Sequence, residues 1–225
     1  MRSTVALKAL MAVTGFIMVA FLIGHMLGNL WVFAGREEFN EYAHHIRTLG
    51  EPMVPHKTLL WIIRIGLLLS IVGHVFAAVT LWRRNVKAVG GAGKRYHTTK
   101  NKRGVQRSYA SFTMRYGGIV ILLFVVYHLL HLTANTIHPG GASDSPYDRV
   151  VNGFEIWWVV ASYTVAMVAL GFHLAHGIWG ASMTLGANTS PERRRFLVGL
   201  STGIASLLVI GFLVPPYSIL FGWIG

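Results

Sequence analysis

Five apolar stretches, separated by polar segments, dominate the pattern of this chain. Each is long enough to cross a bilayer as a helix, which takes about 20 residues. The segments between them hold most of the charged residues, together with clusters of glycine and proline that interrupt helices. We therefore predict one membrane domain over residues 1–225, with five transmembrane helices at about residues 9–33, 58–82, 116–136, 154–183 and 196–223.

The first apolar stretch follows Arg2 and Lys8, an arrangement that also begins a secretory signal peptide. It is longer than the apolar region of a signal peptide and has no obvious cleavage site with small residues. We predict that it is the first membrane span.

Two of the polar connections have a distinct composition. Residues 35–57 contain four glutamates and end with Pro52 and Pro55, and we expect a short interfacial helix at about residues 38–49. Residues 83–115 contain ten basic residues and no acidic one, which predicts a loop without a packed domain.

In the second span Arg64 lies about two turns from the end, where its side chain either extends to the interface or pairs with a cofactor carboxylate.

Composition supports a membrane protein and narrows the chemistry. A mean hydropathy of +0.52 with only 12% charged residues leaves too few charges for the surface of a soluble protein of 225 residues. The net charge of +12 does not indicate nucleic-acid binding, because the basic residues lie between apolar spans. Cysteine is absent, which excludes disulfides, thiolate-bound iron–sulfur clusters and thiol catalysis in this chain.

The distribution of lysine and arginine predicts the orientation. Fifteen of them lie near the N-terminus, in residues 83–115 and in residues 186–195, and four lie on the opposite side. By the positive-inside rule the first group is cytoplasmic, so five spans place the C-terminus outside. The basic loop then faces acidic lipid headgroups or docked cytoplasmic subunits.

Histidines inside four of the spans are the main functional signal. Ionisable groups at membrane depth are costly and usually face the interior of a bundle. With a rise of about 1.5 Å per residue, His25 and His128 lie roughly 28 and 20 Å from the cytoplasmic ends of their spans, in the outer half. Counted from outside with the same rise, His74 and His173 lie roughly 24 and 28 Å deep, in the inner half.

Four histidines at matched depths favour metal ligation over four unrelated buried polar groups. Zinc sites usually add carboxylates or thiolates, whereas two axial imidazoles complete the coordination of a haem iron. We predict an all-α bundle around two stacked bis-histidine haems. His131 and His176 lie one turn from His128 and His173, and either replace them as ligands or, as we favour, contact a propionate, a quinone or a neighbouring helix.

The order and context of these residues resemble a known family. The matching segments are the GHMLGN around His25, the second span with His74, FVVYH at His128, GFHLAHG at His173, and residues 35–44. Together they resemble the dihaem cytochrome b subunit, of the b558 type, of succinate dehydrogenase and fumarate reductase. The resemblance covers the whole chain and implies His25, His74, His128 and His173 as axial ligands of two b-type haems.

The resemblance also implies the setting of the protein. We expect a multi-pass protein of the inner (cytoplasmic) membrane, with a flavoprotein and an iron–sulfur subunit docked on the cytoplasmic side and menaquinone or ubiquinone as the exchange partner. The chain then acts as anchor and electron conductor, and belongs to an enzyme only as part of the complex. The direction, succinate oxidation or fumarate reduction, and the oligomeric state of the complex stay open.

A quinone that gains two electrons also needs protons, so its site requires polar or titratable groups near an interface. On the outside the candidates are His44, Glu51 and His56, with His45 and His138 nearby. On the inside they are Trp82, Arg83 and Ser111, and we favour this side because donor and protons share one compartment.

Two other classes of membrane protein remain as alternatives. The cytochrome b of a bc-type complex carries two histidines on each of two helices, whereas this chain distributes four histidines over four spans. A haem-free transporter with functional histidines would be colourless, so a reduced-minus-oxidised optical spectrum separates it from a cytochrome.

Overall fold

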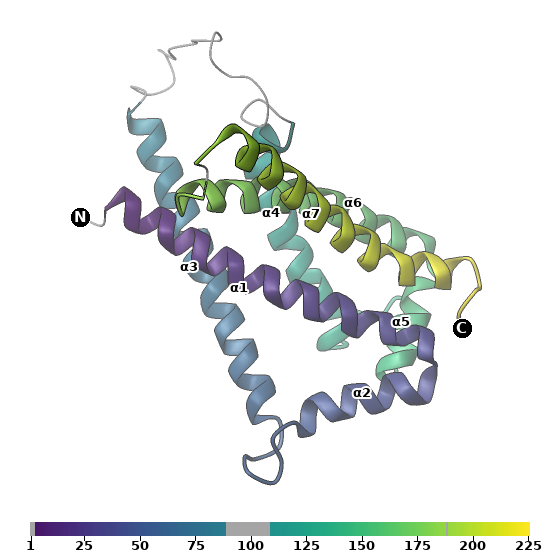
Figure 1. Cartoon of the computed structure of the whole chain (residues 1–225). Helices are drawn as coiled ribbons and strands as arrows, with labels where there is room; N and C mark the ends of the chain where they lie inside the picture. The colour runs from purple at the N-terminus through teal and green to yellow at the C-terminus, as the bar shows by residue number, and fades with distance from the viewer. Residues whose placement is uncertain (1–2, 89–108, 188) are drawn as a thin grey trace.

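The computed structural model describes residues 3–88, 109–187 and 189–225, and the regular elements in these residues are all helical (Figure 1). Among them, five helices are long and apolar enough to cross a membrane. The predicted all-α membrane fold with five spans is therefore confirmed. In chain order the elements are α1 (Thr4–Leu30), the short η1 (Trp31–Ala34), α2 (Arg36–Thr48), α3 (Thr58–Ala88), α4 (Tyr109–His128), the π-helical turn η3 (Leu129–Thr133), α5 (Pro146–Phe154), α6 (Trp157–Thr184) and α7 (Pro191–Leu220).

The last span begins earlier than the sequence pattern predicts. α7 starts at Pro191 rather than Phe196, because the side chain of Ser190 accepts a hydrogen bond from the backbone N–H of Arg193 and proline fits the first helical position. The three consecutive arginines thus lie in the first turns of the helix rather than in a turn before it.

A separate short helix precedes the fourth span. Residues 146–154 form α5, which Ser145 caps by accepting a hydrogen bond from the N–H of Asp148. Ile156 is extended, and α6 starts after it at Trp157 rather than at Phe154. The predicted span therefore includes Phe154, the last residue of α5, and Glu155 and Ile156 separate that residue from α6.

The other spans also differ at their ends. The third ends at Thr133 rather than residue 136, and Asn135 has a left-handed backbone (φ 53°) that stops a helix. α3 continues to Ala88 and α4 begins at Tyr109, so both ends of the predicted loop 83–115 are helical. The short helix expected at about residues 38–49 is present as α2, with Glu37 and Glu38 in its first turn, where the helix dipole favours acidic residues.

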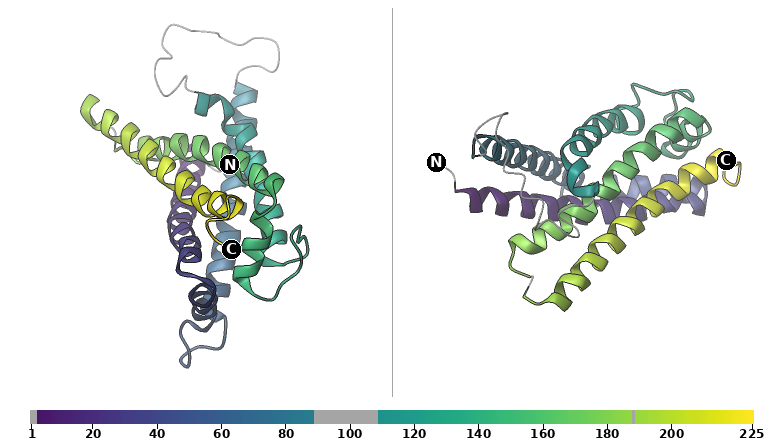
Figure 2. Two further views of the ribbon diagram at one scale, coloured as in Figure 1. Left: turned by 90° about the vertical axis from the view of Figure 1, so that its right-hand side faces the viewer. Right: turned by 90° about the horizontal axis from the view of Figure 1, so that it is seen from above.

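α6 lies at the centre of the bundle, packed against α4, α7 and α1, while α3 packs on α1 (Figure 2). The core between α1, α6 and α7 contains Met26, Met167, Leu170, Leu174 and Leu208. Many large apolar side chains on the outer faces of α3 and α7 are exposed, which is what lipid-facing surfaces require.

The two ends of the bundle differ. At one end, here called the cap end, α2 and α5 lie across the spans (Figure 1), joined by an ion pair between Arg36 and Asp148 at 2.5 Å. The other end, here called the basic end, has the start of α1, the end of α3, the start of α4 and the α6–α7 connection. There Arg84 of α3 donates a hydrogen bond to the hydroxyl of Thr4 at 3.2 Å.

Candidate functional site

His25 of α1 and His128 of α4 meet towards the cap end of the bundle. Their ring centres are 5.7 Å apart and the rings are nearly perpendicular, at 83°. Phe21 stacks on His25 with ring centres 5.2 Å apart, and Phe212 of α7 lies 5.8 Å from it. We call His25 and His128 the cap-end pair.

His74 of α3 and His173 of α6 meet nearer the basic end. Their ring centres are 6.3 Å apart, with the rings inclined at 53°. We call them the basic-end pair. The structure thus brings the four histidines together in the two combinations predicted from depth, across α1 and α4 and across α3 and α6.

The two pairs lie at different levels, as contacts on two helices indicate. On α1, Thr14 contacts His74, and His25 lies eleven residues further on, about 16 Å at the rise of an α-helix. On α6, Tyr163 contacts His128, and His173 lies ten residues further on, about 15 Å. The two helices therefore give nearly the same separation between the cap-end pair and the basic-end pair.

The ring separations fit two imidazoles bound to one iron. A first-row metal ion holds an imidazole nitrogen at about 2 Å, and the ring centre lies about 1 Å behind that nitrogen, so two axial rings on one ion have centres roughly 6 Å apart. Both pairs match this value. In the part of the chain that the structure describes, no cluster of three or more metal-binding side chains occurs, so a zinc site with three or four protein ligands is not formed there.

In one histidine of each pair, a polar contact engages Nδ1 and not Nε2. Nδ1 of His74 lies 3.3 Å from Oγ1 of Thr14, and Nδ1 of His128 lies 3.2 Å from the hydroxyl of Tyr163. In both histidines Nε2 then remains as the nitrogen that can bind a metal ion.

Two glycines lie beside the rings of the basic-end pair, one on α1 and one on α4. A Cβ at Gly15 would lie 3.6 Å from Cε1 of His74, and a Cβ at Gly118 would lie 3.6 Å from Cε1 of His173. Each imidazole therefore packs over a bare stretch of the neighbouring helix, α1 or α4. Near the cap-end pair, Gly24 faces open space, whereas Gly28 is covered by the ring of Tyr42.

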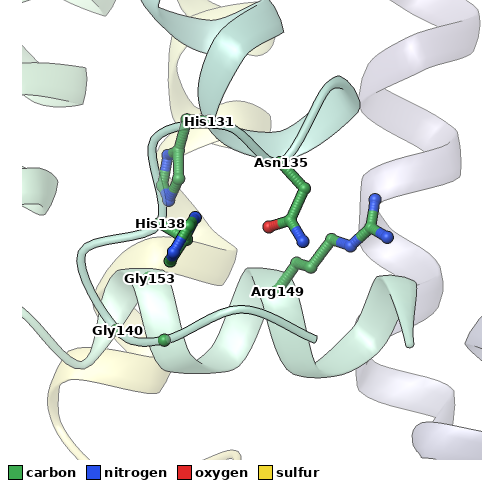
Figure 3. Close-up of a pocket in the computed structure, with 7 residues that line it drawn as sticks. His131, Asn135, His138, Gly140, Arg149 and Gly153 are labelled. Atoms are coloured by element: carbon green, nitrogen blue, oxygen red, sulfur yellow. The ribbon is translucent and has the colours of Figure 1, made fainter. Parts of the chain in front are cut away.

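His131 and His176, the two additional histidines, have different surroundings. His131 is 2% exposed, and its Nδ1 lies 3.1 Å from the hydroxyl of Tyr163. It also lines a small polar pocket with residues of α5 and of the loop before it (Figure 3). His176 packs at a tilt on Trp179, with ring centres 5.8 Å apart. Neither is part of the two pairs.

Comparison with known proteins decides the family. The family model of the succinate dehydrogenase/fumarate reductase transmembrane subunit matches residues 95–212, about half of the chain. The chain belongs to this family. It is also 24% identical, over 204 residues, to the succinate dehydrogenase cytochrome b558 subunit of Bacillus subtilis (strain 168), covering 91% of this chain and 89% of that relative. No solved structure matches the chain.

The remaining residues predicted for the subunit's site do not gather in one place. On the cap side His44, Glu51 and His56 are exposed, and Nδ1 of His56 lies 2.8 Å from a carboxylate oxygen of Glu51. Arg64 is exposed and its guanidinium lies over the ring of Trp61, 5.1 Å from the centre. His45 is exposed as well.

At the basic end, Trp82 of α3 lies under the guanidinium of Arg115, 5.5 Å from the ring centre. Arg83 lies at one end of a groove of roughly 460 Å³ between α3 and α4, otherwise lined by Ile71, Val72, Val75, Phe76, Val79, Thr80 and Leu122. Ser111 is in α4, but its side chain lies outside the described part of the structure.

Sequence reasoning missed Thr14 and Tyr163, the two hydroxyls that contact the histidine pairs of the subunit. Both are polar residues within apolar spans, at the level of a histidine on another helix. That combination is a usable signal, because a hydroxyl at membrane depth requires a partner.

Proposed function

We propose that the chain is the dihaem membrane anchor and electron-transfer subunit of a succinate:quinone oxidoreductase. The observation that carries the proposal is the presence of two histidine pairs with ring centres 5.7 and 6.3 Å apart, about 15 Å from each other along the bundle. The name of the relative, a cytochrome b558 subunit, supports b-type haem as the group they bind. Fumarate reduction by quinol is the alternative direction, since it uses the same pairs.

In this proposal His25 and His128 bind one haem, and His74 and His173 bind the other. A haem bound in this way takes up and releases single electrons, which connects a two-electron donor to a quinone. The protein's contribution is to hold each imidazole on its own helix, with Nε2 free in His74 and His128, and to pack Phe21 and Phe212 against His25.

The basic end supplies the surface for the partners. Arg83, Arg84, Lys87 and Arg115 lie there, and so do the arginines at the start of α7. The positive-inside rule supports a cytoplasmic location for this end, where a flavoprotein and an iron–sulfur subunit dock. A haem held by the basic-end pair would then lie nearer the electron donor, and one held by the cap-end pair would lie nearer the outer surface.

Single replacements of the ligands test this proposal. In the purified complex, His128→Ala removes one haem and keeps the other, and His74→Ala removes the other, because each pair holds its own iron. The haem-to-protein ratio and the reduced-minus-oxidised spectrum measure the outcome. His176→Ala, which removes a histidine outside the pairs, is the matched control and keeps both haems.

Full haem content in His128→Ala or His74→Ala contradicts the ligand assignment. Full haem in His173→Ala would transfer the ligand role to His176.

For the quinone we propose the basic end, near Trp82, Arg83 and Ser111. The groove that ends at Arg83 has apolar walls suited to an isoprenoid tail, and this side shares a compartment with the electron donor. Quinone reduction there moves no charge across the membrane, so the succinate:quinone activity of intact membranes does not change when an uncoupler collapses the membrane potential. A marked loss of activity with the uncoupler contradicts this location and favours the cap side, at His44 to His56.

A further inference from the structure

The hydroxyl of Tyr163 lies between two imidazoles. It is 3.2 Å from Nδ1 of His128 and 3.1 Å from Nδ1 of His131. Tyr163 comes from α6, His128 from α4 and His131 from the π-helical turn after it. Both Tyr163 and His131 are buried, at 6% and 2% exposed, so this contact is shielded from solvent.

Aromatic packing fixes the position of this hydroxyl. Phe124 and Phe154 contact the ring of Tyr163 edge to face, each with ring centres 4.8 Å away and planes at nearly right angles. This is a favourable geometry for aromatic pairs. Gly153, next to Phe154, leaves the space for His131, because a Cβ there would lie only 2.6 Å from Nε2 of His131.

Proton counting gives the contact a direction. A tyrosine hydroxyl has one proton and can donate to only one of the two nitrogens, so the other nitrogen must donate to the hydroxyl oxygen. A neutral histidine that binds a metal ion through Nε2 carries its proton on Nδ1. With His128 bound to a metal ion through Nε2, His128 donates to Tyr163, Tyr163 donates to Nδ1 of His131, and the proton of His131 is on Nε2, towards the pocket of Figure 3.

We propose that Tyr163 is the positioning residue of the cap-end pair: oriented by His131, its hydroxyl accepts the Nδ1 proton of His128 and so fixes the ring, the tautomer and the basicity of that ligand. The inference rests on the proposed haem ligation by His128. An acceptor on the outer nitrogen of a ligating histidine raises its basicity, and a hydroxyl that itself donates to an imidazole is a stronger acceptor.

The basic-end pair has a simpler counterpart. The hydroxyl of Thr14 donates to the backbone carbonyl of Leu10 at 2.7 Å, and its oxygen faces Nδ1 of His74 at 3.3 Å. Its proton goes to a backbone oxygen rather than to a second imidazole. The two pairs therefore differ in what holds the outer nitrogen of one ligand, and Tyr163 acts on the cap-end pair alone.

Redox titration of Tyr163→Phe in the intact complex tests the proposal. The ring and its packing remain, so both haems are retained. The loss of the acceptor makes His128 less basic, which disfavours the oxidised iron. We expect about a tenfold shift of the cap-end component towards the reduced state, a rise of about 59 mV for a one-electron couple. The cap-end component is the one that remains in His74→Ala.

Tyr127→Phe is the matched control. Tyr127 stacks on His131 with ring centres 5.6 Å apart, and its buried hydroxyl has no hydrogen-bond partner in the described part of the chain. Its replacement leaves both potentials unchanged. In His131→Leu, which removes the acceptor of the Tyr163 proton, the same component shifts upwards by less, and His131→Asn restores it because the amide oxygen can accept that proton.

Wild-type potentials in a Tyr163→Phe complex with full haem overturn the proposal, as does an equal shift in Tyr127→Phe. If Tyr163→Phe assembles without haem, the comparison of His131→Leu with His131→Asn decides in the same way. Failure of the ligand assignment is distinguishable, because it appears in the haem content of His128→Ala and not in these potentials.

Discussion

The cap-end pair and the basic-end pair each consist of two histidines, but the residues around the two pairs differ. In the cap-end pair, His128 contacts the hydroxyl of the buried Tyr163, which also contacts His131. The basic-end pair is packed over Gly15 and Gly118 at ordinary van der Waals distance. The difference shows that two like histidine pairs in one bundle can have different neighbours around the outer ring nitrogens.

The side-chain packing around the two pairs also differs. At the cap end, a methyl group added to Gly153 would overlap the buried ring of His131, whereas one added at Gly118 would only touch His173. The packing around His131 at the cap end is therefore tighter than the packing around His173 at the basic end. At the basic end, the described residues include no helix that crosses the spans as α2 and α5 do.

The largest effect on this comparison is expected from Gly153→Ala. The new Cβ, 2.6 Å from Nε2 of His131, displaces a buried side chain and strains its contact with Tyr163. We expect a loss of about 3 kcal/mol in stability, measured as a lower thermal unfolding midpoint of the solubilised complex. Gly118→Ala is the control at the basic-end pair and stays near the wild-type midpoint. Equal midpoints in the two variants contradict the tighter packing of the cap end.

A smaller effect is expected from Asn40→Ala, which loosens the cap without touching either pair. The side chain of Asn40 donates to Oγ of Ser145 at 3.0 Å and accepts from the backbone N–H of Tyr147 at 3.1 Å, so it joins α2 to α5. Its loss costs about 1–2 kcal/mol and increases hydrogen exchange in α5, while exchange around the basic-end pair is unchanged. Arg36→Ala is the control. The Arg36 side chain is 64% exposed, so its ion pair with Asp148 contributes less than about 1 kcal/mol to stability. A larger effect of Arg36→Ala would mean that charge, not the Asn40 hydrogen bonds, holds the cap.

Much of the fold could be predicted because a bilayer imposes strong rules on sequence. The five spans follow from hydropathy and length, and the combination of His25 with His128, and of His74 with His173, follows from depth counting along straight helices. The errors were at helix ends, where a local capping residue such as Ser190 or Ser145 decides the boundary rather than hydropathy.

The surroundings of the histidines could not be predicted in the same way. The contact of Tyr163 with His128 depends on the rotation and crossing of α6 against α4, and hydropathy does not specify either. The same holds for Thr14 and His74. Ligation by the four histidines, the quinone position and the orientation in the membrane stay predictions that the experiments above address.

The most direct test of the account is the haem content of the purified wild-type complex, together with its redox titration. The account predicts two b-type haems per copy of this chain, both low-spin with two axial imidazoles, and two components with different midpoint potentials because the pairs have different surroundings. One haem per chain, or none, would contradict the assignment of the two histidine pairs.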